Sequence, residues 1–99
     1  MNSVFISGEV NRIGTILTRY NSYKFMIIHI WVKSVTKHNE YYNMKVVVRG
    51  DLTNRIRMYL RKKDKIDIRG HLEEHDEKIE LVADRISVNC SKYIDGPLD

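Results

Sequence analysis

The stretch of residues 44–72 constrains the fold more than any other part of the chain. It opens with a short apolar run at residues 46–48, which ends at Gly50. A segment without Gly or Pro follows, in which Leu52, Ile56 and Leu60 recur at helical spacing. Residues 65–70 then alternate between charged and β-branched side chains, which is typical of a half-buried strand. So short a strand–helix–strand unit leaves little room for a parallel crossover, and it predicts a small antiparallel barrel with a helix closing one end.

Alternating side chains predict further strands over residues 3–11, 24–35, 41–49 and 79–84. Residues 16–20 are expected to continue the first strand as a second arm, and residues 73–78 to form a very short acidic hairpin. In the last strand, Ile79, Leu81 and Ala83 are expected to face the core. Five antiparallel strands with one short helix between the third and the fourth describe an all-β oligonucleotide-binding (OB) fold barrel. We expect this barrel to take residues 1–90 as a single domain, followed by a short flexible tail at residues 91–99.

The charge is distributed unevenly along the chain. Residues 1–70 contain 14 Lys and Arg against 5 Asp and Glu, a balance of +9. Residues 71–99 contain 3 Lys and Arg against 8 Asp and Glu, a balance of −5. A basic body is expected of a protein that binds phosphates, although charge alone supports a merely soluble surface equally well.

Cysteine usage and hydropathy bear on the compartment. The single cysteine, Cys90, excludes an internal disulfide and fits a reducing cytosol. The longest apolar run, at residues 25–32, is too short to span a bilayer, and the first residues lack an export pattern. We therefore expect a cytoplasmic protein without membrane contact.

The central stretch VVVRGDLTNRIRMYLRKKDKIDIRGHLE resembles the middle of the bacterial single-stranded DNA-binding proteins. The resemblance extends to NSVFISGEV at residues 2–10, which is similar to that family's first strand, and to ELVADRI at residues 80–86, which is similar to its last. The chain also resembles the primosomal replication protein B branch, which has the same barrel. The resemblance covers roughly residues 2–88 and implies an OB fold, binding of single-stranded DNA and assembly into a dimer or tetramer.

A candidate binding face follows from the alternation of side chains, independently of the resemblance. In the strands at 24–35 and 41–49, one face of each is aliphatic and must be core, because successive side chains point to opposite sides. The other face interleaves aromatic rings with cations, which suits stacked bases and held phosphates. Its residues are His29, Trp31, Lys33, Tyr41, Asn43, Lys45 and Arg49. Alternatively, Ile27 and Trp31 lie under a neighbouring hairpin or in a subunit interface, as does Phe5 on the first strand.

The resemblance also carries over to individual positions. Lys45 and Arg49 fall where the family has basic or aromatic DNA contacts, and Asn43 falls where the best-known members have a tryptophan. The family's long hairpin between strands four and five corresponds here to the short acidic segment 73–77. Its acidic tail that ends in proline and phenylalanine has no counterpart in this sequence. These departures weaken the expectation of tight wrapping and of partner recruitment through a tail.

Other chemistries find less support. The cations Arg55, Arg57, Arg61, Lys62 and Lys63 form either a second phosphate track or, as we favour, the solvated face of a surface helix. His71, His75 and Cys90 match no closed zinc set, so no metal is expected. The glycines form no phosphate-binding loop and no nucleophile has a base beside it, so neither a cofactor nor an enzyme is expected.

The sequence therefore predicts a nucleoid-associated protein that binds single-stranded DNA without sequence preference in replication, recombination or repair. It is expected to act as a homo-oligomer and to meet other replication proteins. The alternative is an accessory factor like primosomal replication protein B, which binds DNA weakly and mainly contacts a partner protein. A third hypothesis is a pure protein-interaction barrel whose acidic end docks a basic partner.

Overall fold

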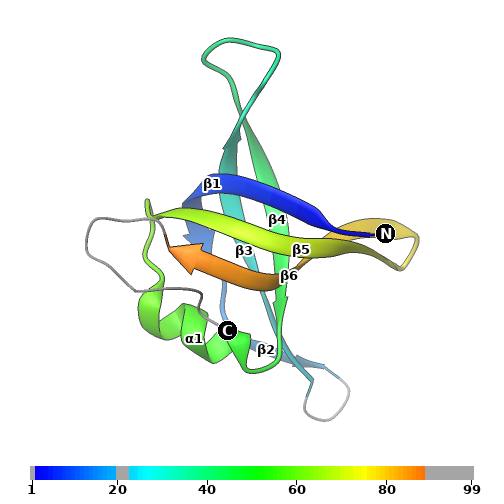
Figure 1. Ribbon diagram of the computed structural model, residues 1–99. Helices are drawn as coiled ribbons and strands as arrows, with labels where there is room; N and C mark the ends of the chain where they lie inside the picture. Colours follow the sequence, from blue (N-terminus) through cyan, green and yellow to red (C-terminus); the bar gives the residue numbers. More distant parts are fainter. Residues whose placement is uncertain (1, 20–22, 89–99) are drawn as a thin grey trace.

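A computed structural model describes residues 2–19 and 23–88 of the chain. Its elements are, in chain order, β1 (Val4–Ile13), β2 (Leu17–Arg19), β3 (Tyr23–Lys33), β4 (Tyr41–Arg49), α1 (Leu52–Tyr59), β5 (Lys65–His75) and β6 (Lys78–Val88). The strands follow one another in the order β1-β5-β6-β4-β3-β2, and an additional pairing of β1 with β3 closes the sheet (Figure 1). The expected OB-fold barrel, with its helix between the third and fourth long strands, is confirmed.

One pair of neighbouring strands in the barrel is parallel. β1 runs antiparallel to β3 and β5, β3 to β4, and β5 to β6, whereas β4 pairs with β6 in parallel at Val46–Leu81 and Val47–Val82. A closed ring of five strands cannot alternate direction throughout, so one parallel pair is required. The expectation of an antiparallel barrel therefore holds for every pair of long strands except β4 and β6.

The core follows the alternation expected from the sequence. Met26, Ile28 and Ile30 on β3 are completely buried, and Val46 and Val48 on β4 face them. Burying an aliphatic side chain of this size contributes about 1.5–3 kcal/mol each, so these two strands supply a large part of the stability. The remaining buried side chains come from every other long strand and from α1.

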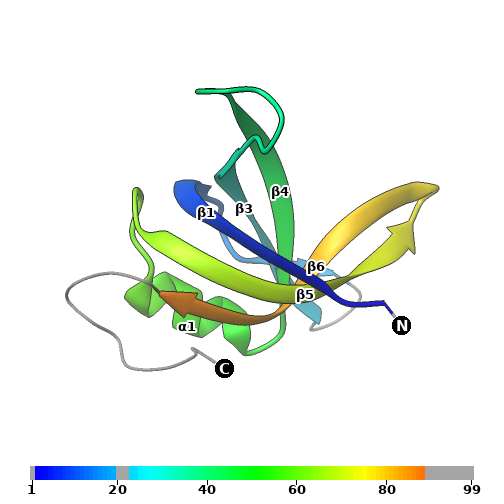
Figure 2. The same cartoon turned by 45° about the horizontal axis from the view of Figure 1, so that its top comes forward.

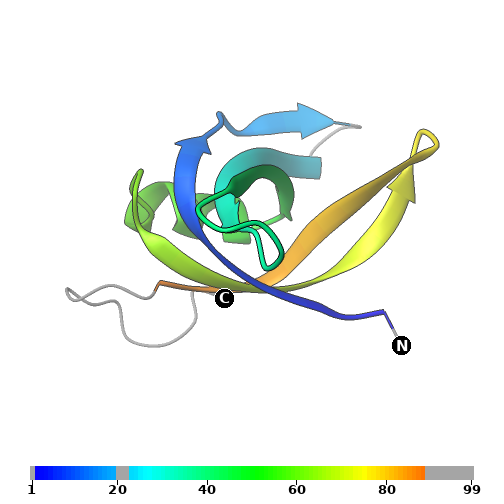
Figure 3. The same cartoon turned by 90° about the horizontal axis from the view of Figure 1, so that it is seen from above.

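The helix closes one end of the barrel. Gly50 adopts a φ of 68°, a conformation that favours glycine, and this turns the chain from β4 into α1. The buried Thr53 hydroxyl donates to the Gly50 carbonyl at 2.7 Å. Ile56 of α1 and Leu60 at its end are buried in the core. Figure 3, the view from above, shows the helix behind the strands.

β1 pairs with two different strands along its length. Its residues 4–9 pair with β5, and its residues 9–13 pair with β3. At Gly8 the strands approach so closely that a Cβ would lie 2.7 Å from the Trp31 carbonyl oxygen, which explains the glycine at this position. The expected second arm at residues 16–20 is the three-residue strand β2, which pairs with the start of β3.

β5 and β6 continue past the barrel as a two-stranded arm, which we define as residues 71–80 (Figure 2). β1 pairs with β5 only as far as Gly70, so beyond that point the two strands pair with each other up to His75 and Lys78. Asp76 and Glu77 form the turn with positive φ angles of 51° and 65°. The short acidic hairpin expected at residues 73–78 is thus a longer ladder, in which Glu73 and Glu74 belong to a strand.

The expected core parity of the last strand is wrong at one position and incomplete at another. Ile79 is 68% exposed because it lies in the arm, beyond the barrel. Val82, expected to point outward, is buried. A bulge at Asp84, which has no partner between the pairs Gly70–Ala83 and Arg69–Arg85, then shifts the alternation so that Ile86 and Val88 face the core.

No helix of the described residues is long and apolar enough to cross a membrane. The expected tail at residues 91–99 and Cys90 lie outside the described residues.

Candidate nucleic-acid interface

The pairing of β3 with β4 brings the candidate residues onto one outward surface. Trp31 lies opposite Asn43, His29 opposite Lys45 and Lys33 opposite Tyr41. The neighbouring residues Ile28, Ile30 and Val46 are completely buried, so the side chains that alternate with them point away from the barrel interior. We call this surface the β3–β4 face, formed by His29, Trp31, Lys33, Tyr41, Asn43 and Lys45.

The aromatic rings of this face are accessible. Trp31 is 38% exposed and Tyr41 is 56% exposed, and together with Glu9 they line a concavity of about 360 Å³. The Trp31 ring is therefore not a core ring. Glu9 is the cross-strand neighbour of Trp31 on β1, which places a carboxylate beside the ring and limits how closely a phosphate can approach there.

The cations of the face are available for an anion. Lys33 and Lys45 are exposed, and neither makes an ion pair with a described residue. Asn43 does not supply a ring, but its side-chain oxygen lies 3.2 Å from His29 Nδ1, and this contact orients the imidazole. The face thus alternates ring and cation, the arrangement on which single-stranded nucleic acids stack and pair their phosphates.

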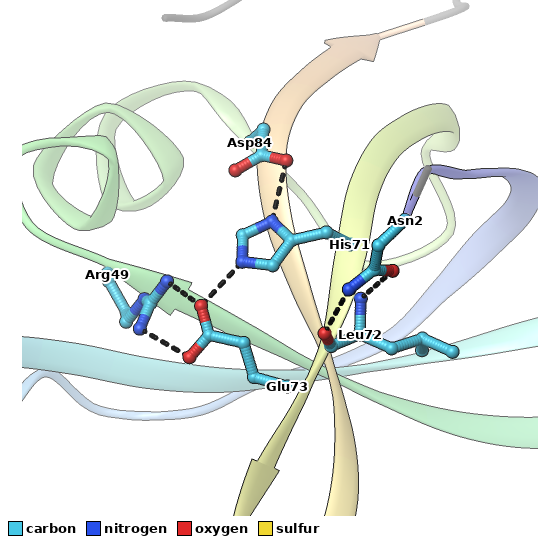
Figure 4. Close-up of polar contacts among 6 residues, drawn as sticks. All are labelled: Asn2, Arg49, His71, Leu72, Glu73 and Asp84. Carbon is cyan, nitrogen blue, oxygen red and sulfur yellow. Dashed lines mark hydrogen bonds and ion pairs between the residues drawn. The ribbon is translucent and has the colours of Figure 1, made fainter.

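Arg49 is placed differently from the other candidates. It lies at the far end of β4, opposite Phe25, and its guanidinium donates two hydrogen bonds to the Glu73 carboxylate at 3.0 and 2.7 Å (Figure 4). This bidentate pair uses the two guanidinium N–H donors that would otherwise bind a phosphate. Arg49 is therefore half-buried and already neutralised by the arm, whereas Lys45 is not.

Glu73 belongs to a chain of charged groups that joins β4, β5 and β6. Its carboxylate also accepts a hydrogen bond from His71 Nε2 at 2.5 Å, and His71 Nδ1 donates to Asp84 at 2.8 Å. Both ring nitrogens face carboxylates, so both must carry a proton and the imidazole is the charged form. We call Arg49, Glu73, His71 and Asp84 the charge relay of the arm.

The relay shifts the pKa values of its members in opposite directions. The hydrogen bond to Asp84, and then that to Glu73, raises the pKa of His71 above its ordinary value. The hydrogen bond from Arg49, and then that from His71, lowers the pKa of Glu73. Both shifts favour the charged forms of His71 and Glu73, and the ion pair of Glu73 with Arg49 fixes the arm to β4.

A groove at the same end of the molecule contains residues that the sequence reasoning did not single out. Tyr23 and Phe25 continue the outward alternation of β3, and their rings lie 6.3 Å apart between centroids with an interplanar angle of 23°. They line a groove of about 320 Å³ between β3 and the arm. The signal was present in the sequence, because both rings share the parity of Trp31.

The remaining candidates are not brought into a site. Arg55, Arg57, Arg61, Lys62 and Lys63 are exposed on α1 and the turn after it, at the end of the barrel away from the arm (Figure 1). The described residues contain no group of His, Cys, Asp and Glu placed to hold a metal ion. His71, one of the metal candidates, uses both ring nitrogens in the charge relay.

The relay predicts a pH-dependent contribution to stability. His71 stabilises the fold fully below its ordinary pKa of 6.5, and this contribution is lost as the pH rises through its raised pKa. Glu73 stabilises the fold fully above its ordinary pKa of 4.5, and its contribution is lost as the pH falls through its lowered pKa. His71→Gln should therefore destabilise most between these two values, by up to about 1 kcal/mol because the pairs are partly solvated.

The measurement is urea unfolding of the wild type and His71→Gln across this pH range. His38→Gln, in the exposed loop between β3 and β4, is the control and should change the free energy of unfolding little. A His71→Gln difference that stays constant from acid to alkaline pH would contradict the charged state assigned to the relay.

Comparison with known proteins finds likeness at the level of fold. No protein-family model matches the sequence, and a search of curated proteins finds no relative. The SSB domain of a Synechococcus sp. protein has a TM-score of 0.71 at 18% identity, covering 87% of this chain and 93% of that chain. A deletion mutant of the single-stranded DNA binding protein from Thermus aquaticus has a TM-score of 0.74 at 15% identity, over 96% of this chain and 44% of that chain. The dimeric N-terminal domain of PriB from Thermoanaerobacter tencongensis has a TM-score of 0.69 at 21% identity, over 91% and 98%. The chain therefore has the fold of SSB domains and of PriB.

Proposed function

We propose that this protein is a non-enzymatic, cytoplasmic and nucleoid-associated factor that binds single-stranded DNA through the β3–β4 face. The observation that carries the proposal is the interleaving of the accessible rings of Trp31 and Tyr41 with the free cations of Lys33 and Lys45 on one surface. Stacking accepts any base and phosphate contacts carry no sequence information, so this face binds without sequence preference. The likeness in fold to a single-stranded DNA binding protein supports the same function in replication, recombination or repair.

A second candidate function is that of an accessory factor like PriB, which binds DNA weakly and mainly contacts a partner protein. The acidic arm favours this candidate, because residues 71–80 carry 5 acidic residues against one lysine and border the groove at one end of β3 and β4. Glu9 beside Trp31 acts in the same direction. The two candidates differ in the salt dependence of binding to an unstructured oligonucleotide, which is steep for the first and shallow for the second.

We also propose that the protein acts as a homo-oligomer, most simply a dimer. Phe5 is 67% exposed on the outer surface of β1, where it lies opposite Arg69 of β5. A ring that is so exposed in the single chain, on the outer face of a sheet, is typical of a surface that a second copy covers in the assembly. The dimeric state of the PriB domain of the same fold supports a symmetric pair, in which the same patch is used by both copies.

Trp31 tests whether the face stacks bases. Adding poly(dT) should quench the fluorescence of this single tryptophan in step with binding, and Trp31→Ala should lower the affinity by about 1–3 kcal/mol. Because the ring is accessible, the free energy of unfolding should change far less than the roughly 3–5 kcal/mol lost with a buried ring. Tyr59→Ala, which removes an exposed ring from α1, is the control and should leave binding unchanged. Normal binding by a Trp31→Ala protein that melts early would refute the stacking role.

Lys45 tests the phosphate contacts. Lys45→Ala should weaken binding to all sequences alike and lower the slope of log K against log salt by about 0.7, the share of one phosphate on a single strand. Arg49→Ala should have a smaller effect on this slope, since Glu73 occupies the guanidinium. Lys62→Ala, after α1, is the matched control and should change neither quantity. A Lys45→Ala slope equal to that of the wild type would remove Lys45 from the site.

The assembly is tested by light scattering at micromolar concentration. The expected mass is at least twice that of the 11.7 kDa chain, and Phe5→Glu should shift it towards the monomer. A wild-type mass equal to one chain would rule out the homo-oligomer.

A further inference from the structure

The groove between β3 and the arm continues the β3–β4 face without a break. Tyr23, Phe25 and Ile27 follow His29 and Trp31 along the same side of β3, and Val47 follows Lys45 along the same side of β4. A strand of DNA lying along the face therefore reaches the groove at its end. We propose that the groove receives one base of the bound strand and selects cytosine and adenine over thymine, because both carry an amino group at the position where thymine carries O4. This inference rests on the proposed function and adds a base preference to it.

The floor of the groove suits a flat heterocycle. Ile27, Val47 and Val82 supply aliphatic surface, and the offset rings of Tyr23 and Phe25 continue it. The volume of about 320 Å³ is at the lower end of the range for small-ligand sites, so it holds a single base rather than several. Stacking on this floor contributes to binding whichever base is present.

The wall of the groove is what distinguishes one base from another. Glu73 and Glu80 face each other across β5 and β6, and both line the groove. Arg49 and His71 draw the Glu73 carboxylate into the charge relay. Glu80 is half-buried and makes no hydrogen bond or ion pair with a described residue, so its oxygens are left to accept a bond from a ligand.

A carboxylate accepts hydrogen bonds and donates none. The N4 amino group of cytosine and the N6 amino group of adenine each donate to such a group. Thymine presents the O4 acceptor at the corresponding position, and two acceptors repel each other. Glu80 is therefore the specificity-determining residue of the groove, and it acts on the base edge while the floor holds the ring.

The composition of the groove favours a base over the cationic side chain of a protein partner. Arg49 lines the same groove but already pairs with Glu73, so a lysine or an arginine would find only the Glu80 carboxylate there and would place its charge against an apolar floor. The carboxylates oppose a phosphate, so the sugar–phosphate chain must pass outside with the base turned inward. A neutral, flat ligand with an amino group at its edge meets both conditions.

The experiment compares oligo(dC) with oligo(dT) of equal length, labelled at one end, by fluorescence anisotropy at one salt concentration. The wild type should bind oligo(dC) at least about fivefold more tightly than oligo(dT), because fivefold is the lower end of the discrimination that one good contact to a base edge provides. Glu80→Gln should bring this ratio close to one, because the amide offers thymine O4 a donor. Glu77→Gln removes the same charge at the exposed turn of the arm and is the control, which should raise both affinities slightly and keep the ratio.

Equal affinity of the wild type for the two oligonucleotides, or a ratio that Glu80→Gln leaves unchanged, would overturn the base preference while the proposed function stands. No binding to either oligonucleotide would remove the proposed function and the inference together. A ratio of one, with oligolysine binding that is lost in Glu80→Gln but not in Glu77→Gln, would instead assign the groove to a cationic protein segment.

Discussion

The antiparallel pairing of β3 with β4, which runs from Phe25–Arg49 to Lys33–Tyr41, is the constraint on which the rest of the structure depends. Because side chains alternate along both strands, the register that buries Ile28 and Val46 also turns Trp31 to the outside. A slip of one residue would exchange the two faces completely. The core and the candidate binding face are therefore two sides of one arrangement, and a change in the pairing alters both.

Electrostatics divides the outer surface of these strands into two halves. Lys33 and Lys45 make the half around Trp31 basic, whereas the arm makes the half around the groove acidic. Arg49 stands at the boundary and is neutralised by Glu73 (Figure 4). The proposed strand of DNA would thus be held by its phosphates at one end of the surface and by a base at the other.

The sequence predicted most of the barrel because apolar side chains recur in its strands and its helix at the spacing of each element. The alternation on β3 and the spacing of Ile56 and Leu60 both lead to the observed core. In the last strand, the predicted core positions Leu81 and Ala83 are confirmed, but Ile79 is exposed and Val82 is buried. The bulge at Asp84 and the extension of β5 and β6 beyond the barrel interrupt the period of two, and neither leaves a mark in the pattern of side chains.

By itself the sequence determined which residues share a face of each strand, since alternation is a property of the local backbone. Alternation thus placed Trp31 and Lys33 on one face of one strand, and Tyr41 and Lys45 on one face of the next. Only the tertiary structure decided that Arg49 is bound by Glu73 and that Tyr23 and Phe25 border a groove. These contacts arise where the parallel pairing of β4 with β6 brings the arm against the sheet. The approach of segments distant in the chain depends on how the whole ring closes, and no local pattern encodes it.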